Sequence, residues 1–203
     1  MTNARKTQIN EDFLLDRRTA VPAVIGEPSD FLIISGLSGA ARDIGYLTEG
    51  APNAYLLGGA MGAAASMGLG LALAQPERRV LIVSGDGEFL MNVSSLATIG
   101  HMRPSNLAML CIDNGRYGET GNQESHTYRT ADLAAIARGS GIDMTLTVRS
   151  EDQFEQAARA LRSESGPSFV VLRVNDGAPA DYARNFDAVE TKANFRRALL
   201  AGY

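Results

Sequence analysis

The stretch Val80-Leu81-Ile82-Val83-Ser84-Gly85-Asp86-Gly87-Glu88 joins an apolar run to a short polar turn. A second stretch has the same design, since the apolar run 107–112 leads directly into Asp113 and Asn114. Both runs have the length and composition of buried strands, so each polar group should lie just past a strand. In a doubly wound α/β fold, ligands bind in the crevice beyond the carboxyl ends of the parallel strands. We therefore expect Asp86 and Asn114 at one rim of such a sheet.

A carboxylate and an amide oxygen at one rim suit a hard cation. Mg²⁺ takes about six oxygen ligands and is usually held by one or two protein groups together with substrate phosphates. Gly87 should let the backbone turn tightly into a helix that starts near Glu88, and the free N–H groups of that helix would face the same crevice. These residues predict a magnesium diphosphate as the ligand.

Gly-Asp-Gly followed by Asn after a helix-sized interval resembles the diphosphate-binding domain of the thiamine diphosphate enzymes. Asn114 lies 28 positions after Asp86 in this chain. The resemblance implies thiamine diphosphate and Mg²⁺ as cofactors, with the metal bound by side-chain oxygens of Asp86 and Asn114 and by the main-chain carbonyl of Arg116. It implies further cofactor contacts from Gly87, Glu88 and Tyr117.

Two residues depart from the family pattern. Asp113 stands where the family usually has the first Asn of a pair, a position that does not itself bind the metal. Glu88 would place a carboxylate beside a diphosphate, which is repulsive unless the side chain turns away or is paired.

A third segment, Gly58-Gly59-Ala60-Met61-Gly62-Ala63-Ala64-Ala65, resembles the glycine-rich turn of the same family. By this resemblance, Met61 is the large apolar side chain that holds the cofactor in its bent shape, and the carbonyl of Gly59 accepts a hydrogen bond from the cofactor's 4′-amino group. Taken alone, the segment is better explained as a small-residue helix packed closely on a sheet. The order of the three segments favours the cofactor interpretation.

Composition limits the other possibilities. The chain has 203 residues, a net charge of -4 and a pI near 5.2, so a basic surface that binds nucleic acid is not expected. The only cysteine, Cys111, falls inside a predicted strand and is interpreted as core filler. No signal-like or membrane-spanning apolar run is present, which predicts a soluble cytoplasmic protein without membrane contact.

The scarcity of lysine excludes two enzyme classes. Lys6 and Lys192 are the only lysines, both in terminal segments, and Gly-x-x-x-x-Gly-Lys is absent. Pyridoxal enzymes and P-loop NTPases therefore have no candidate lysine. Nicotinamide binding is a weak alternative because no Gly-x-Gly-x-x-Gly directly follows a strand.

Apolar periodicity and turn residues predict alternating helices and strands, and hence a doubly wound, mostly parallel sheet with helices on both faces. The predicted helices span 11–20, which Pro22 should end, 60–74, 89–101, 130–138 and 151–163. The predicted strands span 31–35, 80–83, 107–112, 144–148 and 168–174, and residues 36–39 are read as a glycine-rich turn.

The resemblance covers roughly residues 25–174, so we interpret 1–203 as a single domain with 1–24 and 175–203 as peripheral segments. Within the family, the stretches 85–99 and 113–123 look most similar to the beta subunit of sulfopyruvate decarboxylases and to phosphonopyruvate decarboxylases. The family needs a glutamate against the cofactor's pyrimidine ring, and nothing here resembles the domain that carries it. We therefore expect a hetero-oligomer with a separate pyrimidine-domain subunit.

The implied function is that of a lyase that decarboxylates a small 2-oxo acid. Two alternatives stay open: a carboligase or acyltransferase subunit with the same cofactor, and a non-catalytic cofactor-binding or regulatory subunit. Glu119 and Thr120 follow the metal loop where related decarboxylases present residues to the substrate, and they are the candidate catalytic residues. His126 is a proton-shuttle candidate or a structural histidine, whereas His101 suits a helix C-terminus. The arginines that could meet an anionic substrate are Arg42, Arg116 and Arg129.

Overall fold

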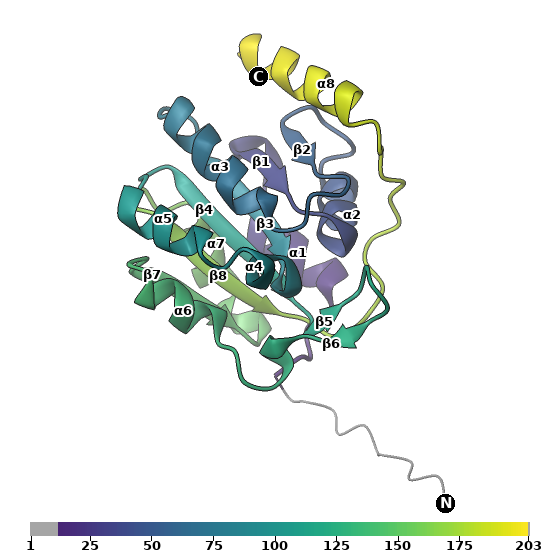
Figure 1. Cartoon of the computed structure of the whole chain (residues 1–203), viewed down its shortest axis with the longest axis vertical. Helices are drawn as coiled ribbons and strands as arrows, with labels where there is room; N and C mark the ends of the chain where they lie inside the picture. The colour runs from purple at the N-terminus through teal and green to yellow at the C-terminus, as the bar shows by residue number, and fades with distance from the viewer. Residues whose placement is uncertain (1–11, 203) are drawn as a thin grey trace, which may run out of the picture.

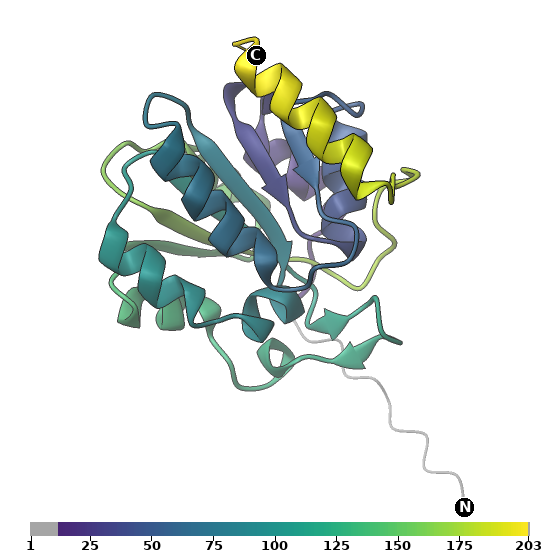
Figure 2. The same ribbon diagram turned by 45° about the horizontal axis from the view of Figure 1, so that its top comes forward.

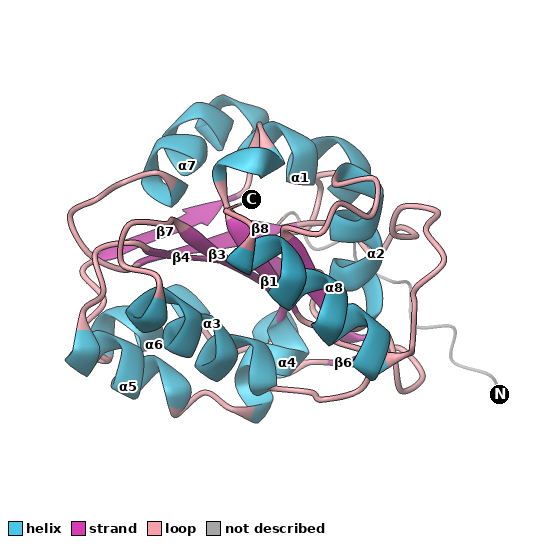
Figure 3. Ribbon diagram, turned by 90° about the horizontal axis from the view of Figure 1, so that it is seen from above, coloured by secondary structure: helices cyan, strands magenta, loops and turns pink. Residues whose placement is uncertain are grey.

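The computed structural model describes residues 12–202 and has a six-stranded sheet between two layers of helices (Figures 1 and 3). All neighbouring strands are parallel, and their order is β2-β1-β3-β4-β8-β7. The predicted doubly wound α/β fold is confirmed. The strands are β1 (Leu32–Ser35), β2 (Ala54–Leu56), β3 (Val80–Gly85), β4 (Leu107–Asp113), β7 (Met144–Val148) and β8 (Ser168–Arg173).

The strand order reverses between β1 and β3. The chain crosses from β1 to β2 on one side, then returns to place β3 and β4 on the other side. Such a reversal leaves a crevice at the carboxyl ends of β1 and β3, because the connections that follow these two strands lead away from each other. The site described below lies at this point.

Helices cover both faces of the sheet. Figure 3 shows one layer above the sheet and a second layer below it. The first layer contains α1 (Arg17–Ile25), α2 (Ser38–Leu47) and α7 (Phe154–Leu161), and the second contains α3 (Ala63–Ala74), α4 (Asp86–Met91), α5 (Ser95–Met102) and α6 (Leu133–Gly139). The C-terminal helix α8 (Ala188–Leu200) lies across the edge strand β2 (Figure 2). Within residues 12–202, no helix has the length and apolar character needed to cross a membrane.

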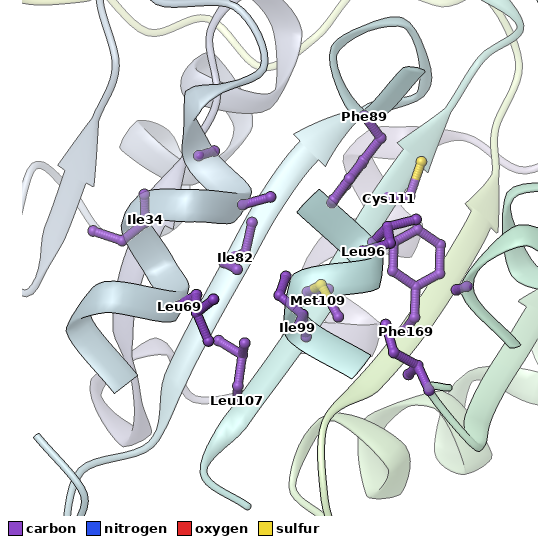
Figure 4. Close-up of a cluster of buried hydrophobic side chains, with 14 of the residues drawn as sticks. Ile34, Leu69, Ile82, Phe89, Leu96, Ile99, Leu107, Met109, Cys111 and Phe169 are labelled. Atoms are coloured by element: carbon purple, nitrogen blue, oxygen red, sulfur yellow. The ribbon is translucent and has the colours of Figure 1, made fainter. Parts of the chain in front are cut away.

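Each face of the sheet has its own hydrophobic core. On the α3 to α6 side, the rings of Phe89 and Phe169 meet edge to face with centroids 5.1 Å apart, and Leu96 and Ile99 pack beside them (Figure 4). Cys111 is fully buried in this cluster, as expected of core filler. The near-continuous burial of β3, β4 and β8 explains why their sequences lack the alternation of a half-exposed strand.

The first helix was predicted wrongly. It begins at Arg17 and includes Pro22, which was expected to end it; the first predicted residue, Glu11, lies outside the described residues. Asp16 caps the helix by accepting a hydrogen bond from the Arg18 N–H. Proline removes one helix hydrogen bond, but the packing of this helix against α2 and α7 outweighs that loss.

Other predicted boundaries were also wrong. The helix predicted over 89–101 is two helices, α4 and α5, because the backbone leaves the helical region at Asn92. Helix α3 starts at Ala63, after Gly62 in a left-handed conformation with φ of 82°. The prediction missed α2, β2, α8 and a small antiparallel hairpin of β5 (Arg116–Tyr117) and β6 (Gln123–Glu124).

Candidate functional site

A pocket of about 470 Å³ opens at the carboxyl ends of the central strands. Its walls come mainly from the segments that follow β1, β3, β4 and β8, with Arg17, Met61 and Arg184 contributed by other parts of the chain. Asp86 and Asn114 both line it. The sequence prediction that these two residues share one rim of the sheet agrees with this geometry.

Asp86 is the first residue of α4 and is 1% exposed. Its Oδ2 atom accepts hydrogen bonds from Ser125 Oγ and from Thr127 Oγ1, the latter at 3.0 Å. Its Oδ1 atom is buried without a hydrogen-bond partner among the described residues. A buried carboxylate oxygen without a partner is costly, so this atom is suited to bind a cation.

A second buried carboxylate, Asp113, lies next to Asp86. Thr127 Oγ1 is within hydrogen-bond distance of both carboxylates, at 2.8 Å from Asp113 Oδ1. The Arg173 guanidinium pairs with Asp113 Oδ2 at 2.9 Å. Burial, followed by the charge of Asp113, raises the pKa of Asp86, and burial raises the pKa of Asp113 although Arg173 opposes the shift. These raised pKa values reflect the cost of ionising two adjacent buried carboxylates beside one arginine, a cost that a bound cation would lower.

Asn114 links the loop after β4 to the segment after β8. Its Oδ1 atom accepts a hydrogen bond of 3.2 Å from the Arg116 N–H, and its Nδ2 atom donates to Asp176 Oδ1 at 3.2 Å. Asn122 donates to the other oxygen of Asp176 at 2.7 Å. These two hydrogen bonds fix the orientation of the Asn114 side chain, the predicted metal ligand, from both sides of the pocket.

Glu88 is buried, and its carboxylate is paired with backbone N–H groups. Oε2 accepts from the Leu37 N–H at 3.0 Å, and Oε1 accepts from the Gly62 N–H at 3.2 Å. Burial raises its pKa, and these hydrogen bonds act in the opposite direction. The residue lines the pocket, but both carboxylate oxygens are already engaged by the protein.

The structure gives a different reason for Gly87 than the sequence suggested. Helix α4 starts at Asp86, so Gly87 lies within the helix and makes no tight turn before it. A Cβ atom at Gly87 would lie 2.5 Å from ring atoms of Tyr117. Glycine is needed here because the Tyr117 ring packs directly against the start of α4.

Glu119 and Thr120, the candidate catalytic residues, line the pocket beyond the β5 strand. Glu119 forms an ion pair of 3.0 Å with Arg184, which comes from the segment before α8. Thr120 donates to Gln123 Oε1 at 3.0 Å. Parts of the segment 175–203, which the sequence reading treated as peripheral, thus reach the pocket.

The glycine-rich turn places Met61 in the wall of the pocket. Met61 is half-buried and belongs to neither hydrophobic core. Gly59 is exposed, and a Cβ atom there would meet no atom within 4 Å. Among residues 12–202, no atom outside the neighbouring residues crowds Gly59, so the packing of this part of the chain does not require a glycine there.

The other candidate groups differ in their relation to the pocket. His126 Nδ1 is 3.4 Å from the Tyr117 hydroxyl, and His101 lies in the last turn of α5 as expected. Arg42 lines the pocket and faces Asp181 at 3.6 Å, whereas Arg129 is an exposed partner of Glu124.

The sequence analysis missed the polar residues that bind the side chains of Asp86, Asp113, Asn114 and Glu119. They are Ser125, Thr127, Arg173, Asp176 and Arg184.

Comparison with known proteins identifies the fold and its family. Residues 35–172 match the family model described as "Thiamine pyrophosphate enzyme, C-terminal TPP binding domain". The chain belongs to this family. The matched range runs from the last residue of β1 to the penultimate residue of β8, and it contains both stretches that led to the cofactor prediction.

Relatives within the thiamine pyrophosphate enzymes have named activities. The "sulfopyruvate decarboxylase subunit beta" of Methanocaldococcus jannaschii is 39% identical over 142 residues, which cover 70% of this chain and 74% of that protein. The "phosphonopyruvate decarboxylase" of Streptomyces viridochromogenes is 34% identical over 186 residues, and the match covers 86% of this chain but only 46% of that protein.

A solved structure agrees on the fold. An X-ray structure from Mycobacterium smegmatis, described as that of a "putative thiamin diphosphate-dependent enzyme", superposes with a TM-score of 0.63 at 21% sequence identity. The match covers 80% of this chain and 32% of that one. At this identity the likeness concerns the arrangement of strands and helices.

The pocket of this thiamine pyrophosphate enzyme domain suits a metal-bound diphosphate. Among residues 12–202, no group of three or more His, Cys, Asp or Glu side chains converges on one point. Mg²⁺ needs few protein ligands when phosphate oxygens complete its coordination. Such an ion would give the unpartnered Asp86 Oδ1 atom a partner and would favour the ionised forms of Asp86 and Asp113.

Proposed function

We propose that this chain is the diphosphate-binding subunit of a thiamine diphosphate- and Mg²⁺-dependent 2-oxo acid decarboxylase, whose substrate carries a sulfonate or phosphonate tail. The observation that carries the proposal is the 39% identity to a sulfopyruvate decarboxylase beta subunit, across most of both chains. In that role Asp86 and Asn114 bind Mg²⁺ through side-chain oxygens, and Arg116 binds it through its main-chain carbonyl. Gly59, Met61, Gly87, Glu88 and Tyr117 surround the cofactor.

The relative's name also supports a second chain, because a beta subunit has a partner. We infer a hetero-oligomer in which the partner supplies the glutamate that activates the cofactor. Bound thiamine diphosphate would supply the carbon nucleophile that attacks the 2-oxo carbonyl and the electron sink into which the bond to CO₂ breaks. The residues of this chain bind and orient the diphosphate, exclude water from Asp86, and place Glu119 and Thr120 on the substrate side.

A panel of 2-oxo acids tests the proposed activity. The chain, assembled with its partner subunit, thiamine diphosphate and Mg²⁺, is assayed for CO₂ and aldehyde release from sulfopyruvate, phosphonopyruvate and pyruvate. We expect kcat/KM at least about tenfold greater for one of the acids with an anionic tail than for pyruvate, a difference of about 1.4 kcal/mol. Condensed products without free aldehyde would instead favour the carboligase, and equal rates for all three acids would refute the substrate class.

Met61 provides a test of the cofactor's place in the pocket. Because Met61 is half-buried and outside both cores, Met61→Ala should change the free energy of unfolding by less than about 1 kcal/mol. If its side chain holds the cofactor bent, hydrogen–deuterium exchange at the thiazolium carbon should slow by about tenfold in the assembled enzyme.

Met109 supplies the matched control, since it is fully buried in β4. Met109→Ala should cost about 2–5 kcal/mol of folding free energy, as core truncations do. A Met61→Ala variant that loses comparable stability and exchanges the thiazolium hydrogen at the normal rate would show that Met61 is structural.

A further inference from the structure

The backbone of Gly62 is held on both sides, by Glu88 within α4 and by Asn92 at the end of that helix. Its N–H donates to Glu88 Oε1 at 3.2 Å, and its carbonyl accepts from Asn92 Nδ2 at 2.9 Å. Gly62 caps α3 in a left-handed conformation, with φ of 82°. Figures 1 and 2 show the start of α3 beside α4. We call Glu88 and Asn92 together the Gly62 clamp.

The clamp also reaches the loop after β1. The second oxygen of Glu88 accepts the Leu37 N–H at 3.0 Å. Gly36 leaves the space for this carboxylate, because a Cβ atom there would lie 2.0 Å from Glu88 Oε2. Glu88 therefore joins three segments of the pocket wall: the loop after β1, the glycine-rich turn and the helix that begins with Asp86.

The clamp connects two parts of the pocket wall, the one that carries Met61 and the one that carries Asp86. Met61 directly precedes Gly62, and Asp86 lies two residues before Glu88. Any shift of the Gly62 peptide would move Met61 relative to Asp86. A buried carboxylate is costly unless its oxygens are hydrogen-bonded, and apolar packing alone could attach α3 to α4. A carboxylate with two backbone donors fixes their relative position more narrowly than apolar contacts do.

We propose that Glu88 and Asn92 are positioning residues, which set the glycine-rich turn at a fixed distance from the metal-binding end of α4. The part of this inference that concerns the cofactor rests on the proposed function. Neither side chain needs to touch the reacting atoms: each acts through Gly62 on the placement of Met61 and Gly59.

Two variants and one control test the clamp in the full chain. Glu88→Gln is isosteric, but its amide nitrogen cannot accept a backbone N–H, so one of the two hydrogen bonds is lost. Asn92→Ala removes the donor to the Gly62 carbonyl from a half-buried position and keeps the Glu88 carboxylate. Glu155→Gln, an exposed change on the opposite face of the sheet, matches the loss of one negative charge.

Amide hydrogen exchange, measured by mass spectrometry on the cofactor-free chain, tests whether the hydrogen bonds of the clamp form. We expect at least one of the two amides bound by Glu88, those of Leu37 and Gly62, to exchange at least about tenfold faster in Glu88→Gln. We expect the 58–62 segment to exchange faster in Asn92→Ala, with the rest of α3 unchanged in both. This follows because a local hydrogen bond controls local opening. Wild-type exchange in both variants would overturn the clamp, and Glu155→Gln should match wild type throughout.

A second measurement separates positioning from plain stability. In the enzyme assembled with its partner, both variants should slow hydrogen–deuterium exchange at the thiazolium carbon by about tenfold, while the Kd for thiamine diphosphate rises less than about threefold. Faster amide exchange with a normal thiazolium rate would show that the clamp is structural only. A wild-type chain that fails to bind thiamine diphosphate would overturn the proposed function, and the amide exchange rates would still decide whether the clamp exists.

Discussion

Replacing Asp86 with asparagine is expected to abolish Mg²⁺-dependent binding of thiamine diphosphate and to leave the fold intact. The substitution removes the charge that a hard cation needs at Oδ1, the atom that has no partner among the described residues. It also removes the repulsion between two buried carboxylates, Asp86 and Asp113. The hydroxyls of Ser125 and Thr127 can donate or accept, so they can rearrange to serve an amide.

Calorimetric titration and thermal unfolding together measure this prediction. We expect the affinity for the cofactor with Mg²⁺ to fall by more than about 100-fold, and the melting temperature of the cofactor-free chain to stay the same or rise. Asn114→Ala should also lose affinity, because it removes the second side-chain oxygen. Asp143→Asn, an exposed change beside Arg103, is the charge-matched control. Cofactor affinity within about threefold of wild type in Asp86→Asn would refute the metal assignment.

The rim position of Asp86 and Asn114 could be predicted because it depends on local pattern and topology alone. Continuous apolar runs mark β3 and β4 as buried parallel strands, and the residue after a parallel strand lies at the carboxyl edge of the sheet. Neither inference needs knowledge of distant contacts. The same pattern led to the correct α/β fold and to the family.

The sequence analysis missed helix α2 because its glycines are explained by tertiary packing and not by a local turn. Gly39 and Gly45 lower helix propensity, and they resemble turn residues in the sequence. In the structure, a Cβ at Gly45 would lie 2.3 Å from the Tyr182 ring, and one at Gly39 would lie 2.5 Å from the Arg17 guanidinium. These glycines permit close packing against residues far away in the chain, which no local pattern shows.

The hydrogen-bond partners of Asp86 were missed for a similar reason. Ser125 and Thr127 are 39 and 41 positions away, in the turn after the β5–β6 hairpin. Arg173 has one sequence signal, a charged residue at the end of an apolar strand, the same signal that pointed to Asp86. Applied to β8, this rule would have placed Arg173 at the rim beside Asp113.

The second large effect expected is that activity requires another chain. Within the described residues, the acidic side chains that line the pocket are Asp86, Glu88, Glu119 and Asp176, and each has a partner already. Glu88 accepts two backbone N–H groups, Glu119 pairs with Arg184, and Asp176 accepts from Asn114 and Asn122. Asp86 is the proposed metal ligand. On the proposed function, we therefore expect the glutamate that faces the pyrimidine ring to come from a partner subunit.

We therefore expect no CO₂ release above the uncatalysed rate from this polypeptide alone with cofactor, Mg²⁺ and substrate, and activity on addition of the partner subunit. Mass spectrometry must verify that the first preparation contains a single polypeptide. The partner mixed with Asp86→Asn should stay inactive, which excludes activity of the partner itself. Robust turnover by this chain alone would mean that one of its own carboxylates leaves its present partner to activate the cofactor. Glu119 would then be the first to test, because its side chain is 38% exposed beside Arg184, whereas Glu88 is buried and accepts backbone N–H groups with both carboxylate oxygens.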